Sequence, residues 1–280
     1  MYEITLQSII FRFKWRIIVT FTLVVLESLL GILYPLLIGL AINDLLDGKY
    51  NGTIYLACLG VGSLAIGSIR RFYDTRVYSR IYCEISPEMV EREYKKGSSV
   101  SKVSARSNLI TEFIEFLENS MPNIIEAVVS LIGIVSIIAV LNLNVFYACI
   151  GLLLFVFFIY AISGKFNYRL NENYNNQLEM QVEALNSKNI STIKEHFNAL
   201  MKWNIKLSDL ETVNYLLVWI GVLALFIFTP MMVIESGVLK YGLVFSVLMY
   251  VFDYIDKVIT FPLYIQQLIR LKEISRRLAE

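Results

Sequence analysis

The sequence predicts an all-α integral membrane protein with six transmembrane helices and long helical extensions outside the membrane. A helix needs roughly 20 mostly apolar residues to cross the hydrocarbon core. Six stretches approach or exceed that length: residues 17–41, 54–69, 124–141, 145–162, 213–234 and 243–265. Apolar residues make up 56 % of the chain and charged residues 18 %, whereas soluble domains average about 45–50 % and 25 %. Both observations favour a chain embedded in the lipid bilayer.

The basic residues are distributed unevenly between the loops, and this predicts the orientation. Three precede the first stretch, nine lie between the second and third, six between the fourth and fifth, and four follow the sixth. The other three loops together hold only Lys49 and Lys240. Because Lys and Arg are enriched in cytoplasmic loops, we expect both termini and both long loops in the cytoplasm, and the protein in a bacterial inner membrane. The net charge of +1 gives no support to nucleic-acid binding.

The first span is preceded by an amphipathic segment, contains a proline and is followed by a turn. Residues 1–14 mix apolar and charged side chains in a pattern typical of a short amphipathic helix on the inner membrane surface. Within the span, Pro35 predicts a kink, because proline cannot donate the helical hydrogen bond. The pairs Asp47-Gly48 and Asn51-Gly52 then predict the turn that leads into the second span.

The two long loops are each expected to form a helical hairpin. After residue 69, apolar residues recur mostly at four-residue steps among charges, which indicates one buried helical stripe: Phe72, Val77, Ile81, Ile85 and Met89. Polar residues 97–107 predict a turn, and the helical pattern resumes at Leu109. The second loop repeats this design, with a polar tip near residues 185–190. No linker divides the chain, so residues 1–280 are expected to form a single domain.

Several stretches resemble the membrane domain of exporter-type ABC transporters, in the order and at the spacing of that family. They are Pro35-Leu36-Leu37-Ile38-Gly39 followed by Ile42-Asn43-Asp44, Arg70-Arg71-Phe72-Tyr73, residues 190–197, Tyr241-Gly242-Leu243 and Phe261-Pro262-Leu263. With six spans and two long hairpins, the resemblance covers nearly the whole chain. It implies a domain-swapped homodimer, in which the fourth and fifth helices reach across to the partner. It also implies a central cavity that works by alternating access.

The chain departs from that family in the features that serve ATP. It contains no G-x-x-x-x-G-K-[ST] phosphate-binding loop, and Asp47-Gly48-Lys49-Tyr50 lacks both the spacing and the hydroxyl residue. Asn189 stands where the family usually has glycine, and the first hairpin tip, residues 98–108, lacks the usual glycine-rich sequence. We therefore expect a chain without an ATPase domain, without enzyme activity of its own and without a cofactor.

Ionisable residues inside the apolar stretches are the candidate functional residues, because charge in the hydrocarbon core is costly and usually faces a pathway or a partner. Glu27 lies some ten residues, or about 15 Å, into the first span. That depth predicts a position at mid-membrane, on one helical stripe with Tyr34. The sixth span carries four more candidates: Tyr250, Asp253, Asp256 and Lys257.

These candidates support two interpretations. In the functional one, Glu27, Asp253 and Asp256 line a water-filled cavity, where they bind a cationic or polar substrate or exchange protons. In the structural one, Asp253 and Lys257, which are four residues apart, neutralise each other on one helix face. Tyr250 forms a cation–π contact with a substrate in the first case and packs in the core in the second.

The remaining reactive residues form no recognisable site. Cys58, Cys83 and Cys149 are scattered, which indicates neither a disulfide framework nor a metal site. His196 is the only histidine and stands in a polar stretch near the second hairpin tip, where we expect a solvated side chain.

Three functions remain open at this point. The first is the membrane half of a transporter whose ATPase is a separate chain that docks on the two tips, residues 98–108 and 185–194. The second is a transporter or channel that works without an ATPase and couples to an ion gradient through Glu27, Asp253 or Asp256; the altered tips and the missing ATPase motif favour it slightly. The third is a non-transport role as a membrane scaffold, regulator or resistance protein, which predicts no cavity wide enough for a solute.

Overall fold

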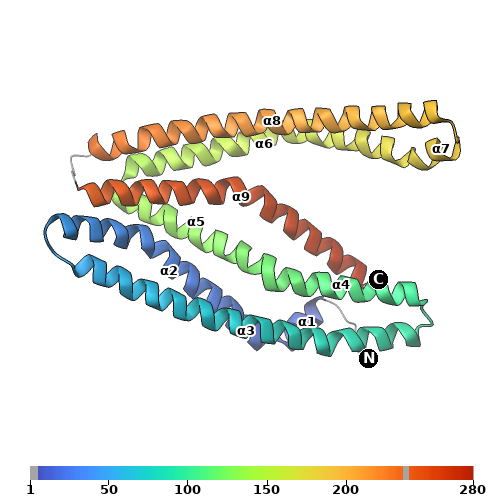
Figure 1. The fold of residues 1–280 in the computed structure, drawn as a ribbon, viewed down its shortest axis with the longest axis horizontal. Coiled ribbons are helices and arrows are strands. Elements are labelled where there is room, and N and C mark those ends of the chain that lie inside the picture. Colours follow the sequence, from blue (N-terminus) through green and yellow to red (C-terminus); the bar gives the residue numbers. More distant parts are fainter. Residues whose placement is uncertain (1–5, 236–239, 280) are drawn as a thin grey trace. The chain divides into compact units, whose positions relative to one another are not determined.

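A computed structural model describes residues 6–235 and 240–279, and every regular element in them is a helix (Figure 1). In chain order the elements are α1 (Leu6–Arg12), α2 (Lys14–Leu46), α3 (Asn51–Lys95), α4 (Val100–Glu115), the π-helical turn η1 (Phe116–Ser120), α5 (Met121–Leu141), α6 (Leu143–Glu179), α7 (Gln181–Asn186), α8 (Ile190–Glu235) and α9 (Tyr241–Ala279). The all-α prediction is confirmed, and each of the six apolar stretches lies within one helix. Residues 1–5 of the predicted amphipathic segment lie outside the described residues.

The helices divide into two compact units. One contains α1 to α5, η1 and α9, and the other contains α6, α7 and α8. In the second unit α6 packs along α8 at small residues; a Cβ atom added at Gly221 would lie 2.8 Å from Leu152 and 3.1 Å from Phe155. The second unit therefore coincides with the fourth and fifth predicted spans together with their hairpin.

Five helices of the described chain are long and apolar enough to cross a membrane, judged by length and composition. They are Lys14–Leu46, Asn51–Lys95, Val100–Leu141, Leu143–Asn186 and Ile190–Glu235. Helix α9, which contains the sixth predicted span, is 39 residues long but carries Asp253, Asp256 and Lys257 in its apolar part. These three charges distinguish α9 from the other five helices, so its place as the sixth span stays a prediction.

The amphipathic N-terminal helix buries part of its apolar face in protein. Ile9 and Phe13 belong to a buried cluster with Tyr78, Ile81 and residues of α4 and η1. By contrast, Phe11 is 70 % exposed. The extensions of α3 and α4 thus supply Ile9 and Phe13 with a protein surface, and the place of this helix on the inner membrane surface stays a prediction.

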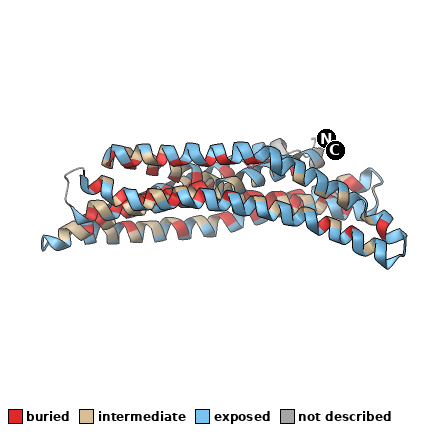
Figure 2. Cartoon of the chain, turned by 90° about the horizontal axis from the view of Figure 1, so that it is seen from above, coloured by how far each residue is buried: buried red, intermediate tan, exposed pale blue. Residues whose placement is uncertain are grey.

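The first hairpin has the buried stripe that its sequence predicts, with one exception. Four of the five predicted stripe residues are buried: Val77, Ile81, Ile85 and Met89. Phe72 is 67 % exposed, because the stripe is continued instead by Asp74 and Tyr78, which are buried. Figure 2 shows such buried positions recurring along the helices, with exposed positions between them.

A buried carboxylate closes the tip of this hairpin. Glu93 is fully buried; its Oε1 lies 3.3 Å from Lys96 Nζ and 3.5 Å from Arg106 Nε. Its Oε2 accepts a hydrogen bond from the Ser98 hydroxyl at 2.8 Å. Burial raises the pKa of Glu93, but the Ser98 bond and the two cations outweigh it, and the pKa lies below the ordinary value of 4.5. The carboxylate therefore stabilises the tip above pH 4.5, and this contribution is lost as the pH falls through the lower, folded-state pKa.

Replacing Glu93 by glutamine is expected to destabilise the first unit by about 2 kcal/mol at neutral pH, because the buried Arg106 loses a charge-assisted contact. The wild-type protein should lose the same contribution below pH 4.5, where the variant should show no further loss. Thermal unfolding of the detergent-solubilised protein at both pH values measures this. Glu91→Gln removes only an exposed pair with Lys95 and serves as the control; equal behaviour of the two variants would contradict the prediction.

Candidate functional site

Two hydroxyl groups of α9 form hydrogen bonds to the backbone of α2 near Pro35. Pro35 lies inside α2, where its ring nitrogen cannot donate to the preceding turn. The Ser246 hydroxyl donates to the Pro35 carbonyl oxygen, and the Tyr250 hydroxyl donates to the Ile32 carbonyl oxygen, both at 2.7 Å. Both side chains are buried, so these bonds fix the position of α9 beside residues 32–35 of α2.

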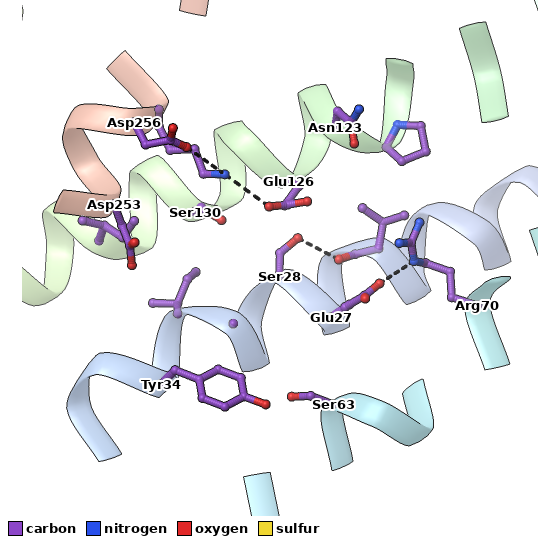
Figure 3. A pocket seen from close by; sticks show the side chains of 16 residues that line it. Glu27, Ser28, Tyr34, Ser63, Arg70, Asn123, Glu126, Ser130, Asp253 and Asp256 are labelled. Atoms are coloured by element: carbon purple, nitrogen blue, oxygen red, sulfur yellow. Dashed lines mark hydrogen bonds and ion pairs between the residues drawn. The ribbon is translucent and has the colours of Figure 1, made fainter. Parts of the chain in front are cut away.

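A cavity of about 380 Å³ lies in the first unit, between α2, α3, α5 and α9 (Figure 3). Its volume is within the range of small-molecule sites, about 300–1,000 Å³. The lining is largely polar, and the polar residues are Glu27, Ser28, Tyr34, Ser63, Arg70, Asn123, Glu126, Ser130, Asp253, Asp256 and Lys257. The non-transport hypothesis predicts no cavity wide enough for a solute, and a space of this volume counts against it.

Carboxylates outnumber cations around the cavity. Arg70 Nε forms an ion pair with Glu27 Oε2, and Lys257 Nζ lies 3.2 Å from Glu126 Oε1 and 3.9 Å from Asp256 Oδ2. Dashed lines in Figure 3 mark these contacts. Asp253 forms no ion pair within 4 Å with any residue that the structure describes. Four carboxylates thus face two cations.

The pairing of Lys257 differs from the predicted one. Four-residue spacing predicts a pair with Asp253, yet the ammonium group lies beside Glu126 of α5 and, less closely, Asp256. Helix periodicity identifies which side chains share a face of one helix, but α5 packs against α9 and brings a competing carboxylate. Asp253, rather than Asp256, is therefore the acid without an ion-pair partner within the described chain.

Glu27 and its partner Arg70 lie at the same distance from the turn that connects their helices. Glu27 is 19 residues before the end of α2, and Arg70 is 19 residues after the start of α3. At 1.5 Å per residue both lie about 29 Å from this turn. The depth of Glu27 in the bilayer depends on where the turn lies relative to the membrane, so its mid-membrane position stays a prediction.

Most of the predicted site residues lie together. Glu27, Tyr34, Asp253, Asp256 and Lys257 all line the cavity. Tyr250 is the exception. It is fully buried and its hydroxyl donates a hydrogen bond to the α2 backbone, so it packs behind the cavity and does not line it.

Two further charged residues line the cavity: Arg70, which the sequence does not single out, and Glu126, which opens the third predicted span and is a fifth charged candidate from the sequence. The sequence pattern places Arg70 in the extension outside the membrane and Glu126 at the start of the third span. Each carries a charge at the edge of an apolar stretch, and Glu27 and Lys257 need partners of opposite charge. That need for a counter-charge is the signal that could have identified Arg70.

His196 in the second unit is not solvated as predicted. It is 6 % exposed, and its Nδ1 lies 3.0 Å from Nε2 of Gln177. The reason is that this face of α8 packs on α6. Among the described residues no group of three or more His, Cys, Asp or Glu side chains could hold a metal ion.

The long apolar helices and the polar cavity define an integral membrane protein of a transport-related class. A family model described as ABC transporter transmembrane region matches residues 6–242. This match covers well over half of the chain, and the protein belongs to that family. The predicted resemblance is thereby confirmed. A comparison with curated proteins gives no match.

Proposed function

We propose that this membrane protein moves a cationic solute through the cavity by alternating access. The observation that carries the proposal is the excess of carboxylates over cations in the lining, with Asp253 outside the ion pairs of the described residues. Charged groups within a membrane pair with one another or with a substrate. A solute with a positive charge would supply the missing counter-charge, and a space of about 380 Å³ suits a small organic cation.

The proposed transporter is a homodimer, with the hairpins and both termini in the cytoplasm of a bacterial inner membrane. Two features support this arrangement. The basic residues are concentrated in the hairpins and at the termini, as expected of cytoplasmic segments. The fourth and fifth spans form a compact unit of their own, which is compatible with a pair of helices that crosses to a partner.

We propose an ion gradient as the energy source, since carboxylates in the cavity can bind an ion and the solute in turn. A second candidate is the membrane subunit of an ABC transporter whose ATPase is a separate chain, and the family match favours it. Gentle solubilisation followed by mass spectrometry separates the two. An ATPase at one-to-one stoichiometry would support the second candidate, and a dimer without an ATPase would support the first.

Replacing Asp253 by asparagine is expected to reduce uptake of a small quaternary ammonium ion into proteoliposomes by about tenfold, the loss of one charge contact of roughly 1.4 kcal/mol. Asp47→Asn is the matched control, because Asp47 lies in the exposed turn after α2. Flux is measured with an imposed proton gradient and without it. Equal flux through the two variants would contradict a role for Asp253, and absence of flux through the wild-type protein with either energy source would contradict transport of this solute class.

A further inference from the structure

Three buried polar atoms without a hydrogen-bond partner lie on adjoining turns of α2 and α3. They are Oγ1 of Thr20, Oδ1 of Asp74 and the hydroxyl of Tyr78. The side chains are nearly or fully buried, at 0 %, 5 % and 0 % exposed. The Thr20 hydroxyl lies beside both neighbours and lowers the pKa of each as a hydrogen-bonding group, although neither contact has the geometry of a full hydrogen bond. Buried polar atoms are almost always paired, and an ionised Asp74 can only accept, whereas the two hydroxyls can donate or accept. The hydrogen bonds of this cluster therefore depend on whether Asp74 carries a proton.

Negative charge is in excess around the cluster. Asp74 Oδ2 lies 3.5 Å from Arg70 Nη1, and the same guanidinium pairs with Glu27 of α2. The charges of Asp74 and Glu115 both act on Glu118 of η1 and raise its pKa, after the larger effect of burial. One guanidinium thus serves Asp74 and Glu27 together, and Glu118 adds a further negative charge that interacts with Asp74.

We infer that Asp74, with Thr20 and Tyr78, forms a proton-binding site between α2 and α3, and that Arg70 couples the occupancy of this site to the cavity. The inference rests on the proposed function, in which the cavity receives a cationic solute. The bond that forms is O–H at Oδ1 of Asp74, and the bond that breaks is an O–H bond of a hydronium ion, which leaves as water. The new O–H can donate to the oxygen of Thr20 or Tyr78, which pairs two of the three unpartnered atoms.

A proton fits this cluster better than a metal ion does. Divalent cations take about six or more oxygen ligands, twice the number of unpartnered oxygens. The burial of Asp74 raises its pKa; Thr20 and Arg70 oppose this effect and Glu27 adds to it. Burial also raises the pKa of Glu118, and the negative charges of Asp74 and Glu115 raise it further by smaller amounts.

The two acids of the site lie outside the predicted spans, which cover residues 54–69 and 124–141, and Thr20 lies near one end of the span 17–41. Asp74 is 23 residues after the start of α3, and Glu118 is 23 residues before the end of α5. Both are therefore about 35 Å along their helices, farther than the thickness of a hydrocarbon core, about 30 Å. These positions place Asp74 and Glu118 on the hairpin side of the predicted spans.

Arg70 provides the coupling because it lines the cavity and contacts both acids. When Asp74 is protonated, the Arg70 guanidinium pairs with Glu27 alone and neutralises it. When a cationic solute binds to Glu27, the guanidinium pairs with Asp74 alone and stabilises its ionised form, so the proton leaves Asp74. Solute and proton therefore weaken each other's binding, and by linkage the effect is reciprocal. This is the thermodynamic requirement for exchange of one for the other.

Infrared difference spectroscopy of the full-length protein in liposomes tests the site directly, through the carbonyl stretch of a protonated carboxylic acid. We expect a band that titrates with pH, disappears in Asp74→Asn and is unchanged in the exposed-acid control Glu91→Gln. Thr20→Val should move the midpoint to higher pH, because Thr20 favours the ionised form. Glu27→Gln should move it to lower pH, because the charge of Glu27 raises the pKa of Asp74 and Arg70 is then paired with Asp74 alone.

Each outcome separates the inference from the proposed function. A titrating Asp74 band in a protein that transports no cation would overturn the proposed function and leave the proton site standing. Transport without an Asp74-dependent band, or a midpoint that Thr20→Val and Glu27→Gln leave unchanged, would overturn the inference. A midpoint that depends on sodium concentration at constant ionic strength would assign the site to a metal cation and also overturn it. If Asp74→Asn fails to fold, the two neighbouring variants decide.

Discussion

Replacing Gly242 by alanine is expected to separate α9 from α2 and to lower the stability of the first unit by about 3 kcal/mol, the upper part of the usual range for overpacking. A Cβ atom at Gly242 would lie 1.9 Å from the carbonyl oxygen of Gly39. That atom belongs to the backbone and cannot rotate away. The substitution would also displace the Gly242 N–H, which donates to Asn43 Oδ1 at 2.9 Å. The whole helix must therefore move.

Thermal unfolding in detergent measures this effect, and a loss of about 3 kcal/mol corresponds to roughly 10 °C for a chain of this size. Gly62→Ala is the matched control, because a Cβ atom there meets nothing within 4 Å and alanine favours helix by about 1 kcal/mol over glycine. A Gly242→Ala protein that unfolds at the wild-type temperature would show that α2 and α9 do not approach as closely as described.

The close contact between Gly39 and Gly242 illustrates what the sequence could and could not predict. Apolar length and helical periodicity identify the helices, because a helix satisfies its own backbone and its buried face repeats every 3.6 residues. Both glycines stand in stretches that resemble the family. Nothing in the spacing says that residues 39 and 242 touch, because that contact depends on how two distant helices pack.

Ion pairing in the candidate site also depends on helix packing that the sequence does not reveal. The positions of Asp253 and Lys257 on one face follow from their spacing, but Glu126 is the closer partner of Lys257, and only the packing of α5 on α9 reveals it. The burial of Asp74 could have been predicted from the sequence, because Asp74 is three residues before Val77 on the buried stripe that includes Ile81. An acid on a buried stripe is costly unless it is paired or protonated, so its position in the sequence is enough to make Asp74 a candidate.

Replacing Arg70 by methionine is expected to have the second large effect. Methionine keeps most of the aliphatic length but leaves Glu27 and Asp74 without their shared cation. Loss of one partner from a buried ion pair costs about 3–5 kcal/mol, and the partial exposure of Arg70, 20 %, and Glu27, 31 %, places the expected loss near the lower end of that range. Thermal unfolding measures the loss, and Arg71→Met, at an exposed neighbouring position, is the control.

A double variant then distinguishes lost charge pairing from lost packing at the same position. Arg70→Met combined with Glu27→Gln removes one unpaired carboxylate, so it should recover part of the stability that Arg70→Met loses. If the loss came only from packing of the arginine side chain, the second substitution would recover nothing and its effect would simply add. Recovery that grows as the pH falls would identify Asp74 as the remaining unpaired acid, because protonation removes the second uncompensated charge. A double variant no more stable than the single one at any pH would contradict the assignment of Arg70 as the shared counter-ion of α2 and α3.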